Sequence, residues 1–195
     1  MNNFKVNLGV LVLIISSCSL MACNTENKKS DTVVTTESQQ AAGNTESKTK
    51  IVQQDHEASQ IIAQYLVLKD ALVGDNAEAS AQASKKLLAT LDSFKADQFN
   101  SDEQLKLAQI LENSKQQATQ ISTSDLAKQR EQFLKLSENM LDLVAITGAP
   151  QQLYQQHCPM YNNNQGGSWL SAQKEIKNPY FGSSMLTCGM VQREI

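Results

Sequence analysis

The chain has 195 residues, of which 41% are hydrophobic and 5% aromatic, and 20 acidic against 17 basic residues give it a net charge of −3. Nucleic-acid-binding domains normally carry a basic stripe, so this charge argues against a nucleic-acid partner. The length suits one ordinary domain. Changes in composition divide the chain into four segments, residues 1–22, 23–50, 51–149 and 150–195.

The first segment, residues 1–22, is typical of a secretory signal peptide. Lys5 precedes the mostly apolar run Val6–Ile15, which is too short to span a bilayer. The sequence Leu20-Met21-Ala22-Cys23 resembles a bacterial lipobox, so we predict that Cys23 is lipidated; Cys18 is an alternative lipid site. We therefore expect a lipoprotein of the cell envelope, on the periplasmic side or anchored in the outer membrane. A plain secreted protein is the alternative interpretation.

The second segment, residues 23–50, has the composition of a spacer. Between Asn24 and Lys50 there is no aromatic residue, and the only large aliphatic residues are Val33 and Val34. Such a stretch cannot bury enough apolar surface to offset its chain entropy. We predict a disordered tether that attaches the folded domain to the membrane through its lipid anchor.

The third segment, residues 51–149, has helical periodicity almost throughout. It contains no Pro, and apolar residues recur at steps of three and four, which indicates four amphipathic helices. Short connections predict an all-α fold, an antiparallel four-helix bundle. The predicted helix boundaries are Gly74, capping boxes Asp75/Glu78 and Ser101/Gln104, an N-cap at Ser122 or Ser124, and a stop at Gly148 and Pro150.

The bundle itself shows no catalytic or metal-binding pattern. Di-metal bundles use Glu-x-x-His pairs, and this segment has none. Its single His, His56, lies near a helix start and is predicted to be solvated or to cap the helix. Arg130 lies on or beside the inner stripe of the fourth helix, where an Arg needs a carboxylate partner, and we predict a structural ion pair with Asp70.

The fourth segment, residues 150–195, places thiols beside thioethers. Met160 follows Cys158 by two residues, while Met185 and Met190 flank Cys188. Thiolate and thioether are soft donors that select Cu(I). We predict a copper(I) site presented by an irregular, Gly/Pro-rich backbone that packs on the bundle. Its candidate ligands are Cys158, Met160, Met185 and Cys188, with His157 or Met190 as an additional ligand.

Three other interpretations of this segment stay open. Cys158 and Cys188 can form a disulfide, which an extracytoplasmic location favours and which would contribute about 3–4 kcal/mol; spacing alone favours it over a metal. The Met residues can fill the core. Zinc is less favoured than copper because its sites usually show paired ligands such as C-x2-C. The sequence contains no C-x-x-C motif, so nothing indicates thioredoxin-like redox catalysis.

Three sequence blocks resemble a known family. They are Tyr65–Val73, the residues Gln129, Arg130, Phe133, Leu136 and Ser137, and the stretch Tyr154–Val191 with Cys158-Pro159-Met160, Trp169-Leu170-Ser171, Asn178-Pro179-Tyr180-Phe181-Gly182 and Cys188-Gly189. Together they resemble the bacterial extracytoplasmic family catalogued as domain of unknown function 3347. The resemblance covers about residues 55–193.

This resemblance implies a role in copper handling. Similar domains are appended to periplasmic membrane-fusion subunits of copper and silver efflux pumps, which shifts the balance for the two Cys residues toward metal. Cys158, Met160, Met185 and Cys188 match the family's sulfur pattern, whereas His157 and Met190 lie outside it. Relatives carry a His near the position of Gln120, so a ligand from the third helix is not expected here.

The sequence thus predicts a lipid-anchored extracytoplasmic copper(I)-binding protein that sequesters the metal or transfers it to an efflux component. The alternative is a helical interaction domain with a permanent disulfide, in which Trp169, Tyr180 and Phe181 form a docking surface for an envelope or efflux partner. No Ser-His-Asp, paired-carboxylate or phosphate-loop pattern is present, so we do not expect an enzyme.

Overall fold

The computed structural model describes residues 45–195, with side chains described from residue 57 onward. The predicted signal peptide, the lipid site Cys23 with its alternative Cys18, and most of the predicted tether lie outside the described residues, as does the side chain of His56. No helix in the described part of the chain is long and apolar enough to cross a membrane.

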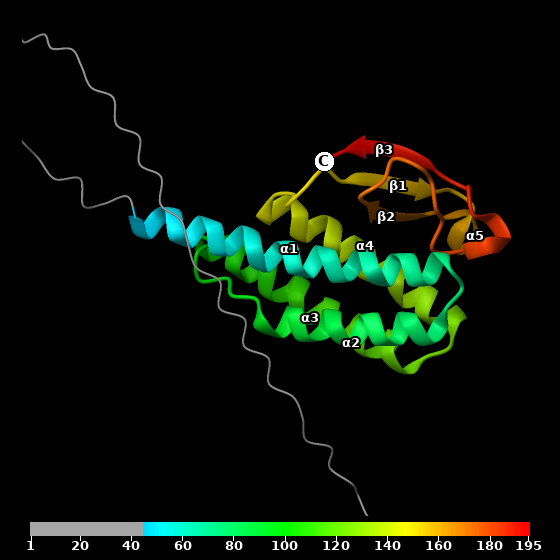
Figure 1. Cartoon of the computed structure of the whole chain (residues 1–195), viewed down its shortest axis with the longest axis horizontal. Helices are drawn as coiled ribbons and strands as arrows, with labels where there is room; N and C mark the ends of the chain where they lie inside the picture. Colours follow the sequence, from blue (N-terminus) through cyan, green and yellow to red (C-terminus); the bar gives the residue numbers. More distant parts are fainter. Residues whose placement is uncertain (1–44) are drawn as a thin grey trace, which may run out of the picture. The chain divides into compact units, whose positions relative to one another are not determined.

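Four long helices follow one another and confirm the helical part of the prediction (Figure 1). They are α1 (Thr45–Val73), α2 (Ala77–Ser93), α3 (Ser101–Thr123) and α4 (Leu126–Thr147). The first begins ahead of the predicted boundary at Ile51. Their buried stripes are the apolar positions that recur at helical spacing, including Ile61, Tyr65, Leu68, Leu72, Leu87, Leu91, Leu107, Ile121, Phe133, Leu136 and Met140.

The helix caps lie close to the predicted positions but on different residues. The N-cap of α2 is Asn76, whose side chain accepts from the Ala79 N–H, while Asp75 adopts a left-handed conformation with φ 55°. Asp75 is not the cap because its carboxylate is engaged by Arg130. The capping box of α3 is Asn100 with Glu103, and α4 is capped by Asp125. Gly148 ends α4 as predicted, with φ 81° and its N–H donating to the Val144 carbonyl.

The C-terminal region is a small antiparallel sheet, so the prediction of an all-α fold with an irregular end was wrong here. The strands are β1 (Tyr154–Cys158), β2 (Gly167–Ser171) and β3 (Met190–Glu194), in the order β2-β1-β3. Two short helical turns, α5 (Tyr161–Asn164) and η1 (Gly182–Met185), lie between them. The strands have five residues each and carry polar side chains even at buried positions such as Gln156, so hydropathy alone gives little sign of them.

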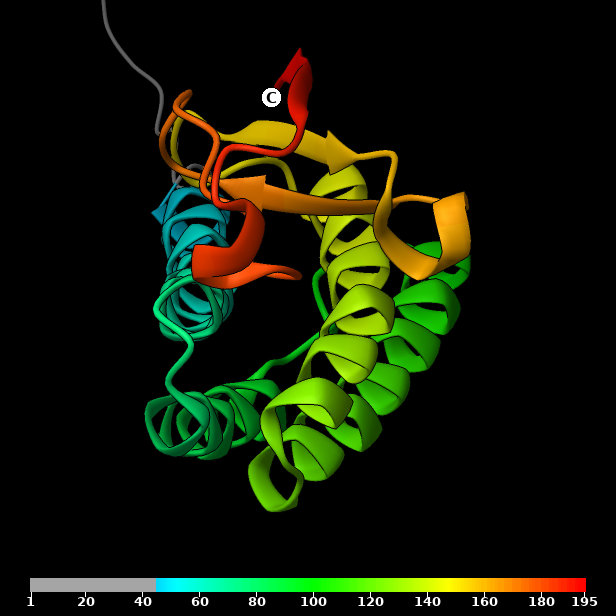
Figure 2. The same ribbon diagram turned by 90° about the vertical axis from the view of Figure 1, so that its right-hand side faces the viewer.

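The sheet and its loops pack against α1 and α4 (Figure 2). These two helices contact each other less than α1 contacts α2 or α4 contacts α3. The β2 strand contacts α4, and the Leu170 N–H on that strand donates to Tyr65 Oη at 3.1 Å. Tyr65 Oη also lies 2.8 Å from Ser137 Oγ on α4. These contacts occupy the outer edge of β2, which removes an unpaired edge from solvent.

Aromatic rings form the junction between the helices and the sheet. Phe133 on α4 stacks on Tyr65 on α1, with ring centroids 5.1 Å apart, and it also contacts Tyr180 at 5.9 Å. Trp169 meets Tyr180 edge-on at 5.7 Å. Trp169 is 0% and Tyr180 2% exposed. The predicted docking surface of Trp169, Tyr180 and Phe181 is therefore wrong, because two of these rings fill the core.

Candidate site at a pair of thiols

The fold brings Cys158 and Cys188 together across 30 residues of sequence, with their sulfur atoms 2.8 Å apart. Cys158 is the last residue of β1 and is fully buried, whereas Cys188 lies in the turn before β3 and is half-buried. Both are free thiols in this structure. The pair can be reached from the Cys188 side and combines two soft donors at one point of the molecule.

The turn that carries Cys188 needs glycine directly after it. Gly189 has φ 144°, a conformation that side-chain-bearing residues rarely adopt. A Cβ at this position would lie 2.9 Å from the His157 carbonyl oxygen and 3.0 Å from the Trp169 ring. The absence of a side chain therefore lets the Cys188 turn approach β1 and brings the second sulfur to the first.

The environment keeps the more accessible thiol protonated. The hydrogen bond with Cys158, burial and the charge that Cys158 would carry all raise the pKa of Cys188 above its ordinary value. The thiolate is the form that attacks electrophiles and binds metals, so the Cys188 thiol is a slow nucleophile at neutral pH. A bound metal ion would have to displace protons from the pair.

His157 and Met190 lie on the other face of the sheet from Cys158. Successive side chains of a strand point to opposite faces, so His157 and Cys158 diverge. The His157 Nδ1 atom is 3.0 Å from the hydroxyl of Ser168, its cross-strand partner on β2. Met190 is paired with His157 in the register of β1 and β3, which places it on the same face as His157. The geometry does not bring either residue to the thiol pair.

The two other predicted thioethers lie beside the pair in sequence. Met160 follows the end of β1 and is 51% exposed, and Met185 is half-buried at the end of η1. The Met185 carbonyl accepts from the Cys188 N–H at 3.0 Å, so both residues belong to one turn. Among the described residues, no group of three or more His, Cys, Asp or Glu side chains could hold a metal ion. The described site is thus a dithiol with neighbouring Met residues.

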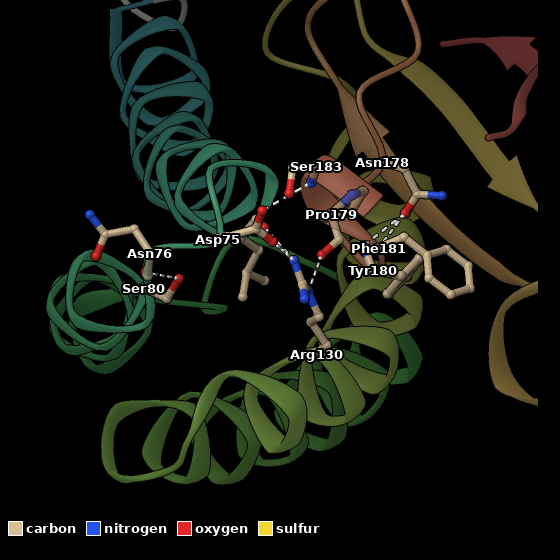
Figure 3. A network of polar contacts seen from close by, with 10 residues as sticks. Asp75, Asn76, Ser80, Arg130, Asn178, Pro179, Tyr180, Phe181 and Ser183 are labelled. Carbon is tan, nitrogen blue, oxygen red and sulfur yellow. Dashed lines mark hydrogen bonds and ion pairs between the residues drawn. The ribbon is translucent and has the colours of Figure 1, made fainter. Parts of the chain in front are cut away.

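Asn178 organises the loop that carries Cys188, a role that the sequence analysis did not assign to it, although it named Asn178 within a block of family resemblance. It is fully buried, and its Nδ2 donates to the Cys188 carbonyl at 2.7 Å. Its Oδ1 accepts from the N–H groups of Tyr180, at 2.8 Å, and Phe181, at 3.2 Å (Figure 3). An Asn directly before a Pro is a common turn initiator, and this was the signal available in the sequence. It does not reveal the partner of Asn178, because Cys188 is ten residues away.

A polar clamp attaches this loop to the helices. Arg130 on α4 donates to the carbonyls of Pro179, at 2.9 Å, and Leu72, at 3.0 Å, and its Nη2 lies 2.5 Å from the Asp75 carboxylate (Figure 3). Asp75 also accepts from the Ser183 N–H at 3.0 Å. Hydrogen bonds from Ser183 and Arg130 lower the pKa of Asp75 to about 2.

The partner of Arg130 is therefore Asp75. The prediction of Asp70 from the sequence was wrong. Asp70 lies beside Lys69 and is mostly exposed. The correction has a simple reason, since Asp70 lies on the last turns of α1 whereas Asp75 lies beyond its end, where the chain turns toward α2.

Comparison with known protein families matches part of the chain to a family model. The family model described as a protein of unknown function, DUF3347, matches residues 61–152, which include most of the helical part of the domain. The chain resembles the DUF3347 family. No curated protein and no solved structure matches the chain. The DUF3347 match ends before β1, so the sheet and the thiol pair lie beyond the matched residues.

Proposed function

We propose that this protein binds copper(I) through Cys158 and Cys188 and that it sequesters the ion or transfers it to an efflux component. The observation that carries the proposal is that the fold brings together the sulfur atoms of two residues that are distant in sequence, 2.8 Å apart without an ion. An ion bound between them requires the two sulfurs to move apart. Two thiolates are a sufficient soft donor set for a Cu(I) ion, which does not demand a fixed coordination geometry.

The neighbouring Met residues extend this donor set. Met185 shares a turn with Cys188, and Met160 is two residues from Cys158. We propose them as auxiliary thioether ligands, which side-chain rotation would bring to the metal. His157 and Met190 are not included, because they lie on the opposite face of the sheet from Cys158.

The compartment is part of the same proposal. The signal-like segment and the lipobox-like Leu20-Met21-Ala22-Cys23 support a lipid-anchored protein of the cell envelope, facing the periplasm or fixed in the outer membrane. A tethered soft-metal site there would capture copper outside the cytoplasm and hold it near membrane-bound transport proteins.

The test is a competition titration with Cu(I) and bicinchoninate, without oxygen, on a chain in which Cys18 and Cys23 are replaced by Ser so that only the pair contributes thiols. We expect one Cu(I) per chain. Cys158→Ser and Cys188→Ser should each abolish competition, and Met185→Leu should weaken it. Met190→Leu is the matched control and should bind as the parent does. Unchanged binding in both Cys variants would contradict the proposal.

The same distance supports a second candidate, a structural disulfide. Closing a 2.8 Å separation to a covalent bond requires only a small movement of the sulfurs. The function would then be that of a cross-linked interaction domain, although without the docking surface that the sequence had suggested. Acid-trapped protein from the cell envelope decides between the two: a Cys158–Cys188 linked peptide favours the disulfide, and two free thiols favour the metal site.

A further inference from the structure

Asn178 contacts the Cys188 turn at two points. Its backbone N–H donates to the Leu186 carbonyl at 2.8 Å, and its side-chain Nδ2 donates to the Cys188 carbonyl at 2.7 Å. These two bonds bracket the residues that present the second sulfur. The position of Cys188 opposite Cys158 thus depends on where Asn178 is held.

The loop that contains Asn178 is held by the helical bundle. The next residue, Pro179, accepts from Arg130 Nε at 2.9 Å (Figure 3). The Gly182 N–H donates to the Asn178 carbonyl at 3.0 Å. Asp75 accepts from Ser183 one residue further on. Arg130 and Asp75 therefore fix the backbone of residues 179 and 183, and Asn178, which adjoins this segment, bonds in turn to the backbone of Cys188.

We propose that Asn178 is the positioning residue of the thiol pair, setting how readily Cys158 and Cys188 act together as a disulfide or as a bidentate metal ligand. The reason is proximity, since two groups that are fixed within reach of one another react or chelate as an intramolecular unit. The copper readout of this proposal rests on the proposed function, whereas the disulfide readout does not.

The test uses Asn178→Asp in the full chain. The substituted carboxylate keeps an acceptor for the Tyr180 and Phe181 N–H groups, but it removes the donor and sets oxygen against the Cys188 carbonyl. The matched control is Asn113→Asp on α3, where the side-chain oxygen likewise accepts, from Gln109 Nε2 at 3.0 Å, without contact to the thiol loop. Asn178→Ser is a second, uncharged variant that keeps a short acceptor and lacks the reach to Cys188.

The first readout is the equilibrium with glutathione. Glutathione disulfide and the dithiol exchange to give the Cys158–Cys188 disulfide and two glutathione thiols, so that one S–S bond breaks and one forms while the two protons move to glutathione. Alkylation followed by mass spectrometry of the Cys158 and Cys188 peptides measures the fractions. We expect the equilibrium constant to fall about tenfold in both Asn178 variants, because a less fixed Cys188 turn lowers the effective concentration of one thiol at the other, and to stay unchanged in Asn113→Asp.

The second readout is the Cu(I) competition with bicinchoninate, where the apparent affinity should fall in parallel in the Asn178 variants. If the parent chain binds no copper, the proposed function fails while the glutathione equilibrium still tests Asn178. A folded Asn178→Asp or Asn178→Ser protein with a parental glutathione equilibrium overturns the proposal. Failure of both variants to fold also overturns it, because Asn178 would then support the whole domain and not the thiol pair in particular.

Discussion

The helical bundle and the C-terminal sheet form one compact unit, but different interactions stabilise them. The bundle is held by aliphatic stripes that repeat at helical spacing, such as Leu68, Leu72 and Leu136, all fully buried. The sheet region is held by single polar contacts and by aromatic rings, with Asn178 and Gln156 buried inside it. The bundle can thus lose one contact and repack, whereas the sheet region depends on a few particular atoms.

This difference explains where the candidate site lies. A thiol pair needs two sulfurs at a fixed separation. Hydrogen bonds depend on direction, so they fix the position of a backbone more closely than apolar packing does. The bundle contributes through Arg130 and Asp75, which hold the loop from outside. The helices are therefore the support, and the sheet with its loops is the part that presents chemistry.

The largest expected effect tests whether the two regions share one core. Phe133→Ala removes a buried ring that contacts both Tyr65 and Tyr180, and it should lower the free energy of unfolding by about 3–5 kcal/mol. Amide hydrogen exchange should show that β1 and β2 lose protection together with the helices. Phe94→Ala, at the far end of α2 beside Phe99, is the control for loss of a ring elsewhere in the bundle. Parental protection of the strands in Phe133→Ala would contradict a shared core.

The next effect tests the polar clamp. Gly182 has φ 54°, and a Cβ there would collide with the Asp75 carboxylate and the Arg130 guanidinium. Gly182→Ala should destabilise the protein by about 3 kcal/mol, through backbone strain and loss of the clamp. Gly148→Ala is the control, because Gly148 also has a positive φ, 81°, but nothing lies within 4 Å of its Cβ position. In thermal unfolding it should cost about 2 kcal/mol, from backbone strain alone, because φ 81° with ψ 161° is a conformation that residues with a Cβ rarely adopt. Equal costs at the two sites would argue against a clamp.

A smaller effect concerns the hydroxyl that joins the helices to the sheet. Burial raises the pKa of Tyr65, so its hydroxyl stays neutral and bonds the Leu170 N–H and Ser137. Tyr65→Phe should cost about 1–3 kcal/mol, because it leaves the Leu170 N–H without this acceptor. In chemical denaturation, Tyr65→Phe combined with Ser137→Ala should cost less than the sum of the two single changes. Simple additivity would show that the two hydroxyls do not act together.

The smallest effect is present at neutral pH and is lost in acid. Because the pKa of Asp75 is lowered in the folded protein, from 3.8 to about 2, its ionised form stabilises the fold above pH 4, and this contribution is lost as the pH falls toward 2. Asp75→Asn should therefore melt below the parent at neutral pH, and the difference should shrink between pH 4 and pH 2. A melting difference of the same size at pH 7 and pH 2 would contradict this role of Asp75.

The sequence predicted the helices because their signal is local. Residues such as Ile61, Tyr65, Leu68 and Leu72 repeat every three or four positions, and burial of that stripe is the reason the helix forms where it does. The exact cap residues were missed by one position because neighbouring Asp, Asn and Ser side chains are nearly equivalent as caps, and the choice of Asn76 over Asp75 follows from the distant Arg130.

For the candidate site, the sequence by itself determined which soft donors are available, and the tertiary structure decided which of them meet. Cys158 and Cys188 come together because β1 and the turn before β3 are adjacent in a sheet that hydropathy does not reveal. His157 was an expected ligand and is separated from Cys158 by one peptide unit, yet strand alternation sends it to the other face. The physical reason is range: helix periodicity acts between neighbours in the chain, whereas the pairing of two sulfurs depends on contacts such as that of Asn178 with Cys188, which only the complete fold provides.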